Sequence, residues 1–319
     1  MGKKVRSKGK NNKNIPLVKK ADTRADKPKV IAVICPITFK DYAEFQQGQL
    51  SEDKRQDIEE FIAEAKELRE CLALETEIDK VLPHVYFLGG EEALKTTLEA
   101  YPEVELDEHC LAFIQTEDGV TFNDVTDVYV SAHGNILGDC IGSKNYHVSV
   151  SPESLGDELN ESFCSEDSEN LPKITIFACY SAAHVFDKQE EKMIDPFSQK
   201  LGNYMSSLLP NFALSIAGYE TPVATGSYLD PEKMSRWVTD FDPFSKKTPV
   251  QTEKLADDAC ITFLYEKHSR NQPVLPIVTD PTNPTQKEWS RFVILPPSKM
   301  KDYVDSMNAE KHRFSRKNL

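Results

Sequence analysis

Short apolar runs alternate with longer amphipathic stretches over the first two thirds of the chain. The clearest run is 29–35 (KVIAVIC), a β-branched segment that stops at Pro36. Apolar runs without polar alternation are typical of strands buried on both faces of a parallel sheet. We therefore predict five such strands, at 29–35, 84–88, 127–132, 173–178 and 212–217, and a short edge piece at 111–115.

The stretches between these runs carry apolar residues at the three- and four-residue spacing of a helix. Pro83 follows the longest of them, and Ser151-Pro152 suits the N-cap and first turn of another. We expect helices over 52–82, 91–100, 152–163 and 195–209. Strands that alternate with helices predict an α/β fold, with a mostly parallel sheet flanked by helices.

The composition changes after the fifth predicted strand. Ten of the 19 prolines fall between Pro222 and Pro297, where only 259–265 and 291–295 have the composition of strands. Proline fixes φ and lacks a backbone donor, so this region favours loops. We divide the chain into a basic leader at 1–28, an α/β domain at 29–225 and a loop-rich C-terminal extension, packed on that domain, at 226–319.

Charge is distributed unevenly along the chain. The sequence has 38 Lys and Arg against 52 Asp and Glu, a formal charge of −14, yet residues 1–29 carry eleven Lys or Arg and only two Asp. The remaining 290 residues therefore carry −23, which argues against nucleic acid as a ligand of the folded body. The leader has too few apolar residues to fold alone, and we expect it to be disordered. It is either a solvated leader, a nuclear address or the contact for an anionic partner such as a polyanion or a membrane surface.

The cysteine pattern indicates a reducing compartment such as the cytoplasm. There are seven cysteines, an odd number, and the closest two are 15 residues apart. Free thiols fit this pattern better than a disulfide framework, and no signal-peptide core follows the basic residues. No apolar run reaches the ~18 residues of a membrane-spanning helix. Metal-ligand spacings such as C-x-x-C and H-E-x-x-H do not occur, so we expect no metal and no cofactor.

Two of the predicted strands end in residues that can carry chemistry. Residues 127–132 run into His133-Gly134, and 173–178 end at Cys179. A right-handed crossover through the intervening helix would make these strands adjacent and parallel, so both side chains would meet at the carboxyl edge of the sheet. An imidazole near a thiol can supply thiolate for attack, and the N–H groups of Gly134 and Cys179 would form an oxyanion hole. The sequence therefore predicts acyl transfer by a Cys nucleophile.

The segments VYVSAHGN at 128–135 and ITIFACYSA at 174–182 resemble the motifs of the caspase-like cysteine peptidases of clan CD. This group includes caspases, metacaspases, legumain, gingipain, clostripain and the self-processing domains of bacterial toxins, and CHAT domains share the layout. The resemblance covers roughly 29–218 and identifies no subfamily. It implies a cysteine endopeptidase acting on a protein or peptide, with His133 as general acid and base, Cys179 as nucleophile and Gly134 at the oxyanion. The spread of the family also leaves open a bacterial effector, secreted without a classical signal peptide and acting in a host cytosol.

The chain departs from the caspase pattern around the nucleophile. Caspases carry Gln-Ala-Cys followed by Arg-Gly, whereas this chain has FACYS at 177–181, so Asp specificity of the caspase type is not supported. Glu220, just after the fifth strand, is the candidate substrate-binding residue and would favour a Lys or Arg side chain. The alternative interpretation of Glu220 is a solvated loop carboxylate.

Other residues and other functions compete with this hypothesis. We expect His184 on a loop or helix after Cys179, His147 in a hairpin and Cys140 in an insertion near the cleft, all three as bystanders. A catalytically inactive relative would act as an interaction scaffold instead. A deamidase-type enzyme would use the same His-Cys dyad for acyl transfer without cutting a chain.

Overall fold

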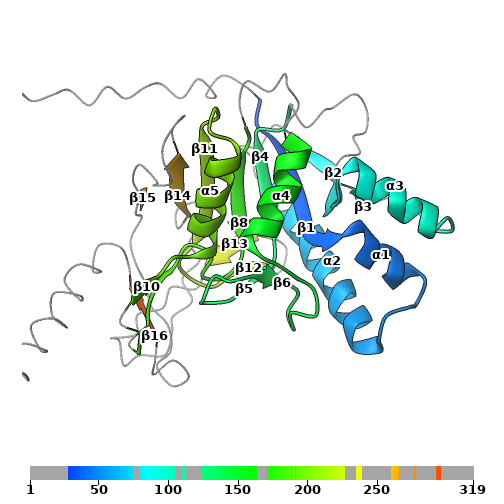
Figure 1. Ribbon diagram of the computed structural model, residues 1–319, viewed down its shortest axis with the longest axis horizontal. Helices are drawn as coiled ribbons and strands as arrows, with labels where there is room; N and C mark the ends of the chain where they lie inside the picture. The colour runs from blue at the N-terminus through cyan, green and yellow to red at the C-terminus, as the bar shows by residue number, and fades with distance from the viewer. Residues whose placement is uncertain are drawn as a thin grey trace, which may run out of the picture.

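The computed structural model describes residues 28–74, 80–104, 110–112, 124–163, 171–187, 189–190, 192–226, 235–238, 260–265, 276–277 and 292–295. Within these residues the core is an eight-stranded mixed sheet with the strand order β15-β14-β11-β8-β4-β1-β2-β3 (Figure 1). Its strands are β1 (Val30–Thr38), β2 (Lys80–Leu88), β3 (Cys110–Ala112), β4 (Asp127–Ser131), β8 (Lys173–Phe177), β11 (Leu214–Tyr219), β14 (Cys260–Tyr265) and β15 (Pro276–Ile277). The six strands from β3 to β11 in this order are parallel, and β14 and β15 pair antiparallel. The expected α/β fold with a mostly parallel sheet is confirmed.

Helices cover both faces of the sheet. The helices α1 (Phe39–Gln46), α2 (Glu52–Ala73) and α3 (Glu91–Ala100) pack on one face, and α4 (Pro152–Phe163) and α5 (Phe197–Leu208) pack on the other (Figure 1). Side chains of β1 alternate between the two cores: Ile31 and Val33 pack with the α2 side, Ala32 and Ile34 with the α4 and α5 side. Burial of both faces is the reason that these strands read as continuous apolar runs.

Hydroxyl side chains begin three of the helices. The Thr38 Oγ1 accepts a hydrogen bond from the Asp41 amide at 3.1 Å, and Ser51 Oγ accepts one from the Lys54 amide at 3.4 Å. The expected N-cap of α4 is confirmed, because the Ser154 amide donates to Ser151 Oγ at 3.1 Å. Each hydroxyl satisfies an amide that the helix itself leaves without a partner.

Three small sheets surround the main one. The first follows β4 and contains β5 (His133–Gly134), β6 (Ile141–Gly142) and β7 (Ser149–Val150), where a turn or hairpin insertion is expected. The second pairs β9 (His184–Asp187) with β10 (Lys192–Ile194) and β16 (Phe292–Leu295). The third is the hairpin of β12 (Val223–Gly226) and β13 (Ser235–Val238), which lies near α2. All three small sheets lie at the edge of the main sheet where β4 ends (Figure 1).

The boundaries around Pro83 differ from the sequence-based expectation. A helix over 52–82 is wrong, because α2 ends at Ala73 and β2 already begins at Lys80. The β2 register along β1 jumps at this point, and Pro83 lies within the irregularity. Proline donates no ladder hydrogen bond and is tolerated in strands at bulges, so here it marks a bulge and not the end of a helix.

Pro36 is another proline that does not end its element. The strand β1 continues through it to Thr38, and the chain enters α1 directly, a helix that the apolar pattern did not predict. The Thr38 cap explains this junction, because one residue ends the strand and starts the helix. Proline shapes the strand locally in both cases while pairing on either side of it holds the strand in the sheet.

The C-terminal region contributes strands to the core. The predicted strands at 259–265 and 291–295 correspond to β14 and β16, and β14 extends the main sheet beside β11. Most of 226–319 lies outside the described residues, as does the basic leader up to residue 27 and most of the edge piece predicted at 111–115. In the described part of the chain, no helix combines the length and the apolar character that crossing a bilayer requires.

Candidate functional site

The predicted meeting of His133 and Cys179 depends on the pairing of β4 with β8. These strands are parallel neighbours, with Asp127 opposite Lys173 and Ser131 opposite Phe177, and the connection between them runs through α4. His133 therefore follows one strand, and Cys179 the other, at the same edge of the sheet. The strand order also reverses between β1 and β4, and ligands of open α/β sheets bind at the carboxyl edge beside such a reversal.

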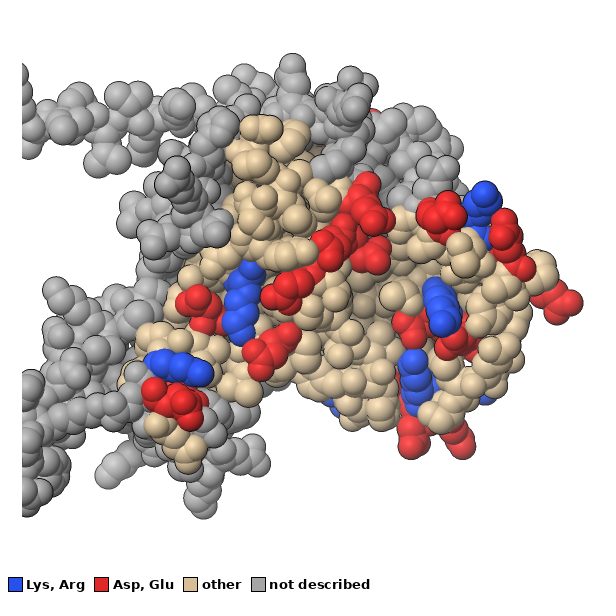
Figure 2. Space-filling view, in the orientation of Figure 1, with Lys and Arg blue, Asp and Glu red and all other residues tan. Residues whose placement is uncertain are grey.

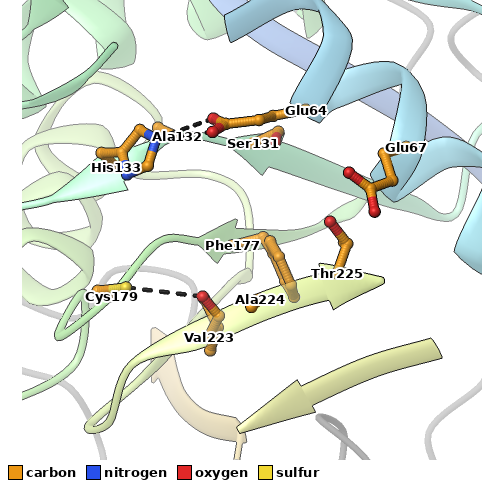
Figure 3. A pocket seen from close by; sticks show the side chains of 10 residues that line it. All are labelled: Glu64, Glu67, Ser131, Ala132, His133, Phe177, Cys179, Val223, Ala224 and Thr225. Atoms are coloured by element: carbon orange, nitrogen blue, oxygen red, sulfur yellow. Dashed lines mark hydrogen bonds and ion pairs between the residues drawn. The ribbon is translucent and has the colours of Figure 1, made fainter. Parts of the chain in front are cut away.

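A pocket of about 210 Å³ opens at this edge, on the face that α2 covers (Figure 3). Three elements besides the two strand ends form its walls: α2 on one side, the hairpin strand β12 on the other, and the turn after β8. The lining residues are Glu64, Glu67, Ser131, Ala132, His133, Phe177, Cys179, Val223, Ala224 and Thr225. The two catalytic candidates thus line one pocket, as their strand-end positions predicted.

The His133 imidazole is held by a carboxylate of α2. Its Nε2 lies 2.8 Å from Oε2 and 3.1 Å from Oε1 of Glu64, 69 residues earlier in the chain (Figure 3). No hydrogen bond to Nδ1 is present within the described residues. A carboxylate on one ring nitrogen fixes the orientation of the ring and leaves the other nitrogen to exchange a proton.

The Cys179 thiol is half-buried and protonated in its resting environment. Its Sγ donates to the carbonyl oxygen of Val223 in β12 at 3.7 Å, and no hydrogen bond joins it to His133 (Figure 3). Burial raises the pKa of the Cys179 thiol, and the negative charge of Glu64 acts in the same direction. The thiol therefore needs a base to become a nucleophile at neutral pH.

Gly134 is required by close packing against the backbone of Cys179. A Cβ at this position would overlap the carbonyl oxygen of Cys179 and come within 3.3 Å of the Ala178 Cβ. Only glycine lets the chain after His133 approach the turn after β8 this closely. This contact brings the chain after His133 against the backbone of Cys179.

Strained backbone occurs next to Cys179. Tyr180, which follows it directly, has φ 58°, and Tyr146 in the turn between β6 and β7 has φ 56°. This left-handed region is costly for residues other than glycine. Burial raises the pKa of both tyrosines to about 12, with lesser contributions from Cys140 and Cys179 at Tyr146 and from Cys179 at Tyr180.

A buried carboxylate of α2 holds the turn that carries Tyr146. Asp57 is 1 % exposed and accepts hydrogen bonds from the Ser143 hydroxyl, from the Asn145 amide and side chain at 3.1 Å each, and from the His147 amide at 3.3 Å. Burial alone would raise the pKa of Asp57, but these donors and the nearby His147 ring lower it. Asp57 and Glu64 are two helical turns apart, so one face of α2 fixes two segments around the site.

Glu220, the predicted substrate-binding residue, is buried outside the pocket. It does not belong to the residues that line the pocket. The solvated interpretation is wrong, because the residue is 6 % exposed and its Oε1 has no partner among the described residues. Burial raises its pKa to about 8, so the side chain is mostly protonated at neutral pH.

The competing candidates lie away from the pocket lining. His184 is in β9, not on a loop or helix, and its Nε2 lies 2.8 Å from Oε1 of Gln199, while burial lowers its pKa. His147 lies in the turn between β6 and β7, and its ring approaches Asp57. Cys140 accepts a hydrogen bond from the Asn135 side chain at 3.3 Å, and burial raises its pKa. None of the three lines the pocket.

Glu64, Glu67 and the β12 segment are site residues that sequence reasoning missed. A signal for the first two exists in the sequence, since the acidic residues Asp57, Glu60, Glu64 and Glu67 recur at helical spacing on α2. That signal is indistinguishable from the ordinary solvated face of an amphipathic helix. The β12 segment carries no catalytic residue type and joins the site only through folding.

Among the described residues, no group of three or more His, Cys, Asp or Glu is arranged to hold a metal ion. Comparison of the chain with protein-family models, with curated proteins and with solved structures found no match.

Proposed function

We propose that this protein is a cysteine endopeptidase of the caspase-like type, with His133 and Cys179 as its catalytic residues. The observation that carries the proposal is the shared pocket at the carboxyl ends of β4 and β8, which both side chains line. The resemblance of the His133-Gly134 and Ala178-Cys179 motifs to clan CD peptidases supports the same chemistry. The substrate is a peptide bond in an extended segment placed between α2 and β12.

The first step transfers a proton and forms a covalent bond. The Nδ1 of His133 takes the Cys179 proton while the thiolate attacks the scissile carbonyl carbon, and the carbonyl electron pair moves to oxygen. The backbone amides of Gly134 and Cys179 stabilise this oxyanion. Because burial raises the pKa of the thiol, proton removal is coupled to substrate binding and is not complete beforehand.

The second step breaks the peptide bond. The oxyanion collapses, the imidazolium of His133 gives its proton to the leaving amine, and an acyl-enzyme thioester remains on Cys179. A water then attacks the thioester with His133 as base, which releases the carboxylic acid and restores the thiol. Glu64 acts as a positioning residue, because its carboxylate holds Nε2 and stabilises the imidazolium in both steps.

Mass spectrometry with a peptide library tests the proposal. The full-length wild type should cut peptides, and Cys179→Ala should not, whereas Cys140→Ala should cut at the wild-type rate. Cys140 is the matched control, since it is half-buried in the neighbouring insertion but does not line the pocket. Equal cleavage by wild type and Cys179→Ala would overturn the assignment of the nucleophile.

The same spectra distinguish the two other functions. Products about one mass unit heavier with intact chains would identify deamidation by the same dyad. Absence of any product from the wild type would instead indicate an inactive interaction scaffold. In that case the proposed function is binding, with the basic leader at 1–28 as the segment that contacts an anionic partner.

A further inference from the structure

Two tyrosines hold a backbone conformation that side chains other than glycine rarely adopt. Among the residues other than glycine that the structure describes, only Tyr146 and Tyr180 have positive φ, at 56° and 58°. This conformation costs free energy and persists only where the surrounding structure enforces it. The neighbours of each tyrosine therefore have to supply compensating contacts.

Packing accounts for the conformation of Tyr180. Its side chain packs against the small apolar cluster of Ile136, Ala183 and Val185. Its amide donates to the carbonyl oxygen of Thr221 at 3.3 Å, and its own carbonyl oxygen accepts from the Ala183 amide at 3.0 Å. The left-handed residue after Cys179 thus serves the local fold of the turn after β8.

Packing in a core does not account for the conformation of Tyr146. The residue is half-buried, but its side chain belongs to none of the three apolar clusters formed by the described residues. Its backbone is held on both sides instead, because Asp57 of α2 accepts hydrogen bonds from the amides of Asn145 and His147 at 3.1 and 3.3 Å. A buried carboxylate thus enforces the strained turn, and the ring that the turn carries does not fill a core.

The turn that carries Tyr146 lies at the same edge of the sheet as Cys179. Strand β6 leads into this turn, and its Gly142 lies opposite His133 of β5. The next residue of β5, Gly134, packs against the carbonyl oxygen of Cys179. The two residues of β5 therefore link the turn to the backbone of the thiol.

The Tyr146 ring is within electrostatic reach of this thiol. Burial raises the pKa of the Tyr146 phenol, and the charges of Cys140 and Cys179 add to the effect. Burial is also the main cause of the raised pKa of the Cys179 thiol. A half-buried ring beside a half-buried thiol, fixed by a strained turn, is placed to exclude water.

We propose that Tyr146 is a positioning residue that covers the Cys179 thiol and excludes water from it. An anion is stabilised by hydration, so withholding water from Cys179 disfavours the thiolate and keeps the thiol neutral until a substrate is bound. This role gives a physical reason for the strained turn, and it concerns the thiol itself and not the bond on which the protein acts.

Alkylation of Cys179 by iodoacetamide, followed against pH in the full-length protein by mass spectrometry of the peptide that contains it, tests the cover. Tyr146→Gly should move the rise in rate to lower pH and speed alkylation at pH 7 by about tenfold, the gain in thiolate that a pKa lower by about 1 gives. Tyr146→Phe keeps the ring and should behave as wild type. Lys144→Ala changes an exposed residue of the same turn and is the matched control, expected to keep the wild-type profile.

A profile that stays in place in Tyr146→Gly, or that moves as far in Tyr146→Phe, would overturn the inference. Glycine adopts positive φ without strain, so Tyr146→Gly should keep its fold, which urea unfolding checks. Asparagine also tolerates this region. If Tyr146→Gly does not fold, Tyr146→Asn decides the question, with the same expected profile.

Peptide cleavage separates failure of this inference from failure of the peptidase proposal. If wild type cuts no peptide but its alkylation profile moves in Tyr146→Gly, the peptidase proposal fails and the cover stands. If wild type cuts peptides but the profile stays in place in Tyr146→Gly, the cover fails and the peptidase proposal stands.

Discussion

The carboxylate of Glu64 holds the imidazole of His133 in the pocket that the Cys179 thiol also lines. Glu64 holds Nε2 at 2.8 Å, and Cys179 lines the same pocket without a hydrogen bond to the ring. The charge of Glu64 also opposes formation of the thiolate. In the proposed mechanism, Glu64 orients the base, while burial together with the charge of Glu64 keeps the thiol protonated before substrate binds.

Replacement of Glu64 should separate these two effects. Glu64→Gln is expected to lower kcat/KM by about 10- to 100-fold, because the imidazolium loses its counter-charge. The same change should lower the pKa of Cys179, which iodoacetamide alkylation measured against pH would detect as an earlier rise in rate. A purely structural role for Glu64 would reduce activity without moving this profile, and Glu59→Gln should alter neither quantity.

Glu220 should make the protein less stable as the pH rises. Its pKa is about 8 in the folded state, whereas an unfolded glutamate titrates near ~4.3. Between these values the folded state holds a proton that the unfolded state releases, so the free energy of unfolding falls with increasing pH. Glu220→Gln should therefore be more stable than wild type at pH 8, by an amount on the order of 4 kcal/mol, and nearly equal to it at pH 4. Urea unfolding of both proteins at both pH values measures the difference. An equal difference in the free energy of unfolding at pH 4 and pH 8 would contradict the raised pKa of Glu220.

The helix α2 is the element that assembles the site. Its apolar face packs on the sheet, and its acidic residues contact two segments that are distant in sequence. Asp57 holds the turn at 143–148, Glu60 pairs with Lys144 at 3.6 Å, and Glu64 holds His133. A rigid helix thereby fixes loops that have little regular structure of their own.

The contribution of Asp57 should appear in both stability and local order. Asp57→Asn places an amide donor against the donors of Ser143, Asn145 and His147, and should lower the free energy of unfolding by about 2–4 kcal/mol at pH 7. Because the pKa of Asp57 is lowered in the fold, the wild-type advantage should be present above the ordinary Asp pKa of ~3.9 and fade at lower pH. Urea unfolding at pH 7 and pH 3, with hydrogen exchange of 143–148, checks this. Equal loss in exposed Glu59→Gln, or a wild-type advantage unchanged at pH 3, would contradict it.

Across the whole molecule, the acidic side chains of the body are gathered in particular places and not spread evenly. Acidic side chains gather over α4 on the face shown in Figure 2, where Glu153, Asp157 and Glu161 are exposed. Burial, and to a lesser degree the neighbouring carboxylates Glu161 and Asp157, raise the pKa of Glu158 within this group. The carboxylates around the pocket belong to α2, on the other face of the sheet. The −23 of the body therefore includes two separate groups of carboxylates, one over α4 and one on α2.

The predictable part of the architecture came from patterns within single elements. Apolar runs located β1, β4, β8 and β14, and the crossover rule correctly made β4 and β8 neighbours. The errors occurred at Pro36 and Pro83, where pairing with adjacent strands outweighs the local preference of proline. Strand pairing is a tertiary interaction, and periodicity along one segment contains no measure of it.

The sequence by itself determined the α/β alternation and the strand-end positions of His133 and Cys179, because side-chain periodicity and the handedness of crossovers are local properties. Only the tertiary structure decided which carboxylates serve the site. Glu64 reaches His133 across 69 residues, and Val223 reaches Cys179 across 44. It also buried Glu220 and placed Glu67 among the residues that line the pocket. Such pairings depend on how a helix face is oriented by its packing on the sheet, and that orientation is set by the whole core.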